Sequence, residues 1–267
     1  MPQAPMKRKK WITPAFALVA AAGMAYVTYE VTDPLQGCRL AQKTVLTPSL
    51  EQKAPVLVIP GFLNSDGYMS VLRERLNQAG HPAYGWNMGL NTGANEQTAA
   101  LLRQRLMEIY SQSGQKVALV GYSLGGVYAR ELAKTDADKV ERVITLAALF
   151  GLDDGKGGAD QRILSVYAAF QGKAMPQQHV TQESAQILQF LKTPPAVPTT
   201  SIYSTHDMFV PATASRMQAS SLQAEEIMVA PGHIAMPFNA AVARVVIHRL
   251  AEPMATWKPT RQGNCAK

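Results

Sequence analysis

One serine of this chain stands in a pattern that suits a nucleophile. Ser123 lies in the pentapeptide Gly121-Tyr122-Ser123-Leu124-Gly125, which follows the apolar run Val117–Val120 and precedes apolar residues at helical spacing. In such a strand-turn-helix elbow the serine backbone is strained, and Gly121 and Gly125 avoid collisions with the neighbouring backbone. The serine then stands at a helix N-terminus, whose free N–H groups favour negative charge. The pattern predicts a nucleophile; a glycine-rich turn that cradles a phosphate is the alternative.

A serine hydroxyl needs a base to take its proton and an acid to hold that base in the right tautomer. Of the five histidines, His233 follows the last predicted strand, on a loop before the final helix. Asp207 follows the preceding strand, so the chain order is serine, aspartate, histidine, as an elbow fold requires. Asp153 and Asp154 are the runner-up acids, but the glycines around them favour a solvated loop. We therefore predict that Ser123, Asp207 and His233 form a catalytic triad.

Attack by such a serine creates an oxyanion, which backbone N–H groups stabilise. We expect one donor from Leu124, directly after the nucleophile, and the other from Phe62, in the turn Pro60-Gly61-Phe62 after the first core strand. An ordinary tight turn would explain Gly61, but not why the turn follows the strand whose loop should carry the donor. No metal and no cofactor is implied by this chemistry.

The elements that must position these residues alternate between strands and helices. Strands are predicted at Val56–Ile59, Ala83–Met88, Val117–Val120, Val140–Leu149, Thr200–Tyr203 and Glu226–Val229, and helices at Gly67–Ala79, Asn95–Tyr110, after Ser123, and at Asn239–Leu250. This alternation predicts an α/β fold with a mostly parallel sheet and helices on both faces. Because ligands bind at the carboxyl ends of the strands in such sheets, the candidate residues should meet at one edge.

Residues 151–197 interrupt the alternation. The segment begins with four glycines among its first eight residues, carries two stretches with a helical pattern, and ends in a proline-rich run. An insertion of this size between core strands predicts a lid or cap over the site. A peripheral helical pair with no gating role is the alternative.

The N-terminus combines positive charge with an apolar run. Residues 7–10 are all basic, and Trp11–Tyr29 is uncharged and mostly apolar. This pattern is typical of a signal anchor or a cleaved signal peptide, and either one sends the rest of the chain across a membrane. We expect a catalytic domain on the non-cytoplasmic side, as in the bacterial periplasm, or a secreted one. The expected organisation is a membrane or signal segment at 1–31, a linker at 32–53, a catalytic domain at 54–252 and a tail at 253–267.

The sequence holds two cysteines, Cys38 and Cys265, which lie near the two ends of the exported part. A single pair in an oxidising compartment favours a disulfide between the terminal arms. Two unpaired cysteines on the arms are the alternative.

Composition limits the classes of protein that the chain can belong to. An apolar content of 47% with 17% charged residues is that of a globular domain with a substantial core. The net charge is +7, but residues 1–31 hold four of the 26 basic residues and one of the 19 acidic ones, which leaves +4 for the rest. That remainder shows no long basic cluster interleaved with aromatic residues, so nucleic acid is not an expected partner.

Four segments, VLVIPGF, VGYSLGG, SIYSTHDMFVP and PGHIAM, occur in this order and together resemble the α/β-hydrolase superfamily, most of all its bacterial lipase and esterase branch. The resemblance spans about residues 54–250. It differs from many lipases at the oxyanion turn, where Pro60-Gly61 replaces His-Gly. The resemblance implies the same roles as above for Ser123 (nucleophile), Asp207 (acid), His233 (base), and Phe62 and Leu124 (oxyanion donors).

The sequence thus predicts a serine hydrolase that cleaves a carboxylic ester, from a small molecule or a lipid, through an acyl-enzyme. The same site could instead pass its acyl group to an alcohol or amine acceptor, which would make the protein an acyltransferase. A non-catalytic binding module on this fold is the third hypothesis, and it would need an incomplete triad.

Overall fold

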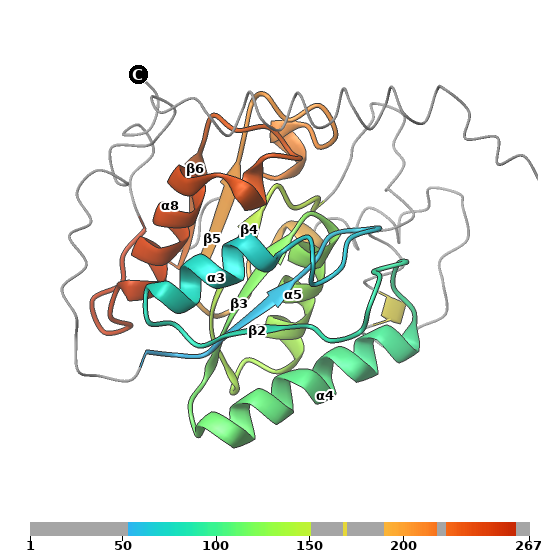
Figure 1. The fold of residues 1–267 in the computed structure, drawn as a ribbon, viewed down its shortest axis with the longest axis vertical. Coiled ribbons are helices and arrows are strands. Elements are labelled where there is room, and N and C mark those ends of the chain that lie inside the picture. Colours follow the sequence, from blue (N-terminus) through green and yellow to red (C-terminus); the bar gives the residue numbers. More distant parts are fainter. Residues whose placement is uncertain (1–52, 151–167, 170–189, 218–222, 260–267) are drawn as a thin grey trace, which may run out of the picture.

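The computed structural model describes residues 53–150, 168–169, 190–217 and 223–259 (Figure 1). The predicted membrane or signal segment, both cysteines, Asp153, Asp154 and most of the predicted lid lie outside these ranges, so those interpretations stay predictions. No helix within the described ranges is long and apolar enough to cross a membrane.

In the part of the chain that the structure describes, six strands form one parallel sheet in the order β2-β1-β3-β4-β5-β6. The strands are β1 (Val56–Ile59), β2 (Ala83–Gly85), β3 (Val117–Tyr122), β4 (Val140–Leu146), β5 (Thr199–Tyr203) and β6 (Ala224–Met228). The predicted α/β class with a parallel sheet is thereby confirmed. Because the chain leaves β1 toward one side for β2 and returns to the other side for β3, the strand order reverses between β1 and β3, where parallel sheets bind ligands.

The central strands β1 and β3 are apolar on both faces because helices cover both faces. Every residue of β1 and of β3 is buried. Leu57 and Ile59 of β1 belong to one core cluster, which we call the α4/α5 face, whereas Val56 and Val58 belong to a second cluster, the α3/α8 face. Alternate side chains of a strand point to opposite faces, so β1 contributes to both cores.

Within the described ranges, four α-helices supply the other half of these cores: α3 (Ser70–Gln78), α4 (Glu96–Ser113), α5 (Leu124–Thr135) and α8 (Ala240–Ala251). Leu102 of α4 and Leu132 of α5 pack on the first face, and Leu76 of α3 and Val246 of α8 pack on the second. Helices α3 and α8 contact each other there (Figure 1). Two short 3₁₀ helices, η1 (Ala212–Ala214) and η2 (Met236–Phe238), follow β5 and β6.

Asparagine side chains set the starts of two helices. The Asn95 side chain accepts a hydrogen bond from the Thr98 N–H at the start of α4, and the Asn239 side chain accepts from Ala241 and Val242 at the start of α8. These caps satisfy N–H groups that have no partner inside the helix. The sequence predicted helices that begin at Asn95 and Asn239. In the structure these residues are the caps, and α4 and α8 each begin one residue later.

Two predicted strands are longer than the observed ones. The strand predicted at Ala83–Met88 ends at Gly85, because the N–H groups of Trp86 and Asn87 donate to the Asp66 carboxylate. The strand predicted at Val140–Leu149 ends at Leu146, because Ala147 has a φ of 47°. A positive φ is not compatible with extended backbone.

The end of the predicted lid is part of the core. Leu191 and Val197 are buried in the α4/α5 face. The guanidinium of buried Arg130, on α5, donates to the carbonyls of Leu191, Lys192 and Thr193. Residues 190–197 are therefore fixed on α5, and the gating role of the rest of the insertion stays a prediction.

Candidate active site

Ser123 stands in the strained turn that its neighbours predict. Its backbone has φ 52° and ψ −122°, between the end of β3 and the first residue of α5. A Cβ on Gly121 would lie 2.3 Å from the Gly125 carbonyl oxygen, and a Cβ on Gly125 would lie 2.4 Å from the Ile59 carbonyl oxygen. No side chain fits at those distances, so the two glycines are required by the turn. A strained residue held this firmly is typical of a functional site.

Asp207 is fixed as a hydrogen-bond acceptor on the loop after β5. Its Oδ1 accepts hydrogen bonds from the N–H groups of Phe209 and Val210, both at 2.8 Å. Its Oδ2 lies 2.7 Å from Nδ1 of His233, and the Asp207 side chain is only 2% exposed. Two backbone donors thus hold the carboxylate in one orientation, with one oxygen left for the imidazole.

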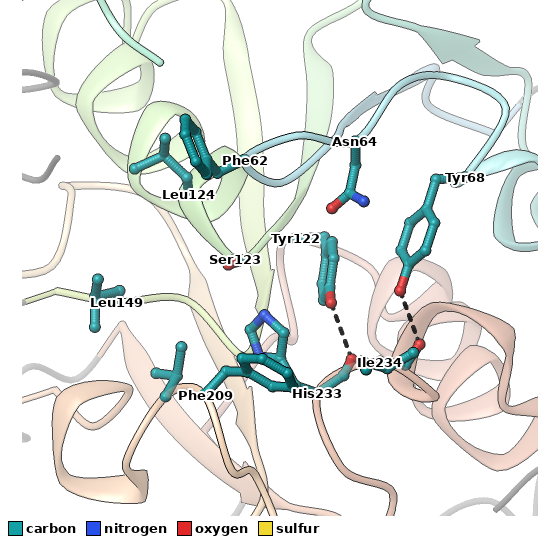
Figure 2. A pocket seen from close by; sticks show the side chains of 11 residues that line it. Phe62, Asn64, Tyr68, Tyr122, Ser123, Leu124, Leu149, Phe209, His233 and Ile234 are labelled. Atoms are coloured by element: carbon teal, nitrogen blue, oxygen red, sulfur yellow. Dashed lines mark hydrogen bonds between the residues drawn. The ribbon is translucent and has the colours of Figure 1, made fainter. Parts of the chain in front are cut away.

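His233 lies on the loop after β6, between Asp207 and Ser123. Because Nδ1 faces Asp207, the other ring nitrogen, Nε2, is the one that Figure 2 shows pointing toward Ser123. The imidazole is flanked by the rings of Tyr122 and Phe209, at centroid distances of 5.0 and 5.5 Å. The structure therefore brings together the three residues that the sequence singled out, and their catalytic roles stay a prediction.

Two tyrosines that sequence reasoning missed hold the backbone of the histidine loop. The Tyr122 hydroxyl donates to the His233 carbonyl at 3.0 Å, and the Tyr68 hydroxyl donates to the Ile234 carbonyl at 2.9 Å (Figure 2). The two phenol rings stack with centroids 5.7 Å apart. Burial raises the pKa of both phenols, so both keep the proton that these bonds need. The only sequence signal was the place of Tyr122 beside the serine.

The predicted oxyanion turn follows β1 and is held by the loop between β2 and α4. Leu63, directly after Phe62, has a φ of 57°. Its N–H donates to the Asn91 carbonyl at 2.7 Å, and the Asn91 N–H donates to the Asn64 carbonyl at 2.8 Å. Among the described residues, no acceptor bonds the N–H of Phe62 or of Leu124. Both predicted oxyanion donors are therefore available to a bound group.

Asn91 is a second residue that the sequence did not reveal. Its side chain is fully buried, and its Nδ2 donates to the Pro60 carbonyl at 2.8 Å. Its Oδ1 accepts from the Tyr128 hydroxyl of α5 at 3.0 Å. One carboxamide thus ties the oxyanion turn to the helix that begins at Leu124, so both predicted donors are held by one network. An asparagine in a polar loop carries no local sign of such a role.

These residues surround a cavity of about 440 Å³ at the carboxyl edge of the sheet (Figure 2). This is within the size range of small-molecule sites. In the part of the chain that the structure describes, no group of three or more His, Cys, Asp or Glu side chains could hold a metal ion. The eleven residues that line the cavity are Phe62, Asn64, Tyr68, Tyr122, Ser123, Leu124, Leu149, Phe209, Val210, His233 and Ile234.

Comparison with known proteins identifies the fold. No protein-family model matches the sequence, and neither does any curated protein. Among solved structures, the chain is similar to the Bacillus licheniformis lipase BlEst2 in mature form, with a TM-score of 0.54, 18% identity, and coverage of 78% of this chain and 96% of that one. It is similar to Aspergillus fumigatus lipase B, with a TM-score of 0.55, 17% identity, and coverage of 75% and 53%.

A thioesterase domain from the curacin biosynthetic pathway is also similar, with a TM-score of 0.50, 12% identity, and coverage of 73% of this chain and 91% of that one. At these identities the likeness concerns the fold alone. The chain has the α/β-hydrolase fold, as the resemblance of its four segments implied.

Proposed function

We propose that the protein is a serine hydrolase that cleaves carboxylic esters through an acyl-enzyme. The observation that carries the proposal is the line from Asp207 through His233 to Ser123. Nδ1 of the imidazole lies 2.7 Å from the carboxylate, and its other nitrogen points toward the serine at the floor of a cavity. An imidazole held in this tautomer is a base for a serine hydroxyl.

The proposed reaction has two halves. In the first, Ser123 Oγ attacks the ester carbonyl carbon while His233 Nε2 takes the serine proton, and the N–H groups of Phe62 and Leu124 stabilise the oxyanion. The bond to the alcohol oxygen then breaks as the imidazolium returns its proton to that oxygen. In the second half, His233 deprotonates a water molecule, whose oxygen attacks the carbonyl carbon of the acyl-enzyme. The bond to Ser123 Oγ then breaks as the imidazolium returns its proton to Oγ, which frees the serine and the carboxylic acid. Asp207 stabilises the imidazolium in both halves.

The similar structures support this reaction class in general terms. Two of them are lipases and one is a thioesterase domain, so all three are named for ester or thioester cleavage. Transfer of the acyl group to an acceptor other than water uses the same first half. The products formed with and without an added alcohol or amine distinguish hydrolysis from acyl transfer.

The decisive experiment is labelling by a fluorophosphonate probe, because it tests nucleophile activation without knowledge of the substrate. We expect the purified protein to be labelled at Ser123 and to release p-nitrophenol from short p-nitrophenyl esters. We expect the Ser123→Ala variant to do neither while it keeps its melting temperature. Esterase activity that survives Ser123→Ala undiminished would falsify the assignment.

A further inference from the structure

The cavity has two chemically different sides, and Ser123 lies between them. Leu124, Leu149 and Val210 belong to the core of the α4/α5 face, whereas Tyr122, with Tyr68 packed beside it, belongs to the core of the α3/α8 face. Figure 2 shows the same division, with Leu124 and Leu149 on one side of Ser123 and the two tyrosines on the other. The division arises because the serine stands at a strand end, where the two layers of the domain meet.

Asn64 adds a carboxamide to the tyrosine side. The Asn64 Oδ1, the Ser123 Cβ and the Tyr122 ring atom Cδ1 each lie 3.0 Å from the point where a Cβ on Gly61 would stand. The three groups therefore surround the same point, and the carboxamide lies near the candidate nucleophile. Figure 2 shows the Asn64 side chain directed into the cavity.

The fold uses the backbone of Asn64 and not its side chain. The Asn64 N–H donates to the Gly61 carbonyl at 3.0 Å, and the Asn64 carbonyl accepts from the Asn91 N–H at 2.8 Å. Its φ is not positive, so the turn does not favour asparagine at this position. No side-chain hydrogen bond holds its carboxamide within the described part of the chain. A donor and an acceptor are thus free for a bound molecule.

The two sides face different parts of an ester. The leaving alcohol must accept its proton from His233, and the tyrosine side is bonded directly to the His233 and Ile234 carbonyls. The other side carries the side chains of Phe62 and Leu124, whose N–H groups are the expected donors to the carbonyl oxygen. This arrangement favours an ester whose alcohol lies along the polar side and whose acyl chain lies along the apolar side.

We propose that Asn64 is a specificity-determining residue that hydrogen-bonds a hydroxyl group on the alcohol portion of the substrate. The substrate class is then an ester of an apolar carboxylic acid with a small polyol, in which one hydroxyl is esterified and a neighbouring one is free. This assignment rests on the proposed function, because it needs an ester bound over Ser123.

The test compares two esters of equal length, 2-hydroxyethyl hexanoate and propyl hexanoate, which differ by a hydroxyl in place of a methyl group. The wild-type protein should have the higher kcat/KM for the hydroxyethyl ester. In Asn64→Leu the ratio of the two kcat/KM values should fall about tenfold, as expected for the loss of one partly exposed hydrogen bond. Asn64→Gln, which keeps a carboxamide, should recover part of the ratio. Gln104→Leu, an amide-to-leucine change on the exposed face of α4, is the matched control and should keep the wild-type ratio.

An unchanged ratio in Asn64→Leu overturns the proposal, including the case in which both esters become slower to the same extent. A ratio that changes only for a pair of esters differing by a hydroxyl on the acyl chain overturns the assignment of the two sides. If the proposed serine hydrolase function itself is wrong, the result is different: the wild-type protein would hydrolyse neither ester and would not be labelled by the fluorophosphonate probe.

Discussion

At the carboxyl edge of the sheet polar side chains face a cavity, whereas at the amino edge they are buried against one another. Arg249, near the end of α8, places its Nε 2.5 Å from the carboxylate of Glu225, near the start of β6, and both side chains are at most 1% exposed. The Arg142 guanidinium donates to the carbonyls of Arg249 and Glu252. The amino edge thus brings buried charges together with carbonyls and a carboxylate of the protein itself.

The carboxyl edge has its own pair, the buried Asp207 side chain and the partly buried His233, but this pair leaves polar atoms open to the cavity. One nitrogen of His233 and the carboxamide of Asn64 face the cavity, and among the described residues the N–H groups of Phe62 and Leu124 have no acceptor. The comparison teaches that one fold uses buried polar groups in two ways. Groups whose partners come from within the protein contribute to stability, and groups left without a partner are available to a ligand.

Four predictions test this division, and the largest effect is expected at the carboxyl edge. Asp207→Asn should lower kcat for a p-nitrophenyl ester by about 10⁴-fold, because an amide at this position favours the wrong imidazole tautomer. The melting temperature should change little, since the isosteric amide keeps its oxygen as an acceptor for Phe209 and Val210. Steady-state kinetics and a thermal melt check the two parts. A fall in kcat of less than tenfold would contradict the role of Asp207.

The second largest effect is expected at the amino edge and on stability alone. Arg249→Met should lower the free energy of unfolding by about 3–5 kcal/mol, because it leaves the buried Glu225 without this cation. The kcat per folded molecule should stay within twofold, since the site lies at the opposite edge. Urea unfolding and titration of active serines with a fluorophosphonate measure both quantities. Replacing Glu225 by Met in the same chain should restore part of the lost stability.

The third prediction concerns pH. Burial lowers the pKa of His81 from its ordinary 6.5 to about 4, with the nearby positive charges of Lys53 and Arg142 adding to the effect. The folded protein therefore binds a proton less readily than the unfolded chain, so the free energy of unfolding should fall as the pH decreases from about 6.5 to about 4. His81→Phe should flatten this dependence, as measured by urea unfolding at several pH values. An identical slope in the variant would contradict it.

The smallest effect is expected from the tyrosine that joins the serine to the histidine loop. Tyr122→Phe removes the hydrogen bond to the His233 carbonyl but keeps the ring, so we expect kcat to fall about tenfold with KM nearly unchanged. The pH dependence of kcat/KM should also shift, because the imidazole is less well positioned relative to Asp207. Tyr84→Phe, on β2 away from the cavity, is the control and should leave both measurements unaltered.

Much of the fold could be predicted because its signals are local. The apolar runs at Val56–Ile59 and Val117–Val120 and the helical spacing after Asn95 need no knowledge of distant residues. The signal for Ser123 is also local, because the strained turn at this residue requires Gly121 and Gly125 on either side. Asp207 and His233 could be predicted to lie close together because each follows a predicted strand of a parallel sheet, and such strands end at the same edge.

The features that could not be predicted from the sequence depend on contacts between distant parts of the chain. The bond from Tyr68 to Ile234 joins residues 166 positions apart, and the one from Asn91 to Pro60 joins residues 31 apart. No pattern around Tyr68 or Asn91 indicates such partners. The early end of β2 has the same origin, because Asp66 takes N–H groups that would otherwise extend the strand.

Tyr122 also limits how freely the elbow can be exchanged. It is bonded covalently to Ser123 and by a hydrogen bond to a residue 111 positions away, so the pentapeptide is matched to one histidine loop. Grafting the corresponding five residues from another hydrolase would preserve the turn but detach it from that loop. For this protein, the unit that an engineer can transplant is the elbow together with the segment that carries His233.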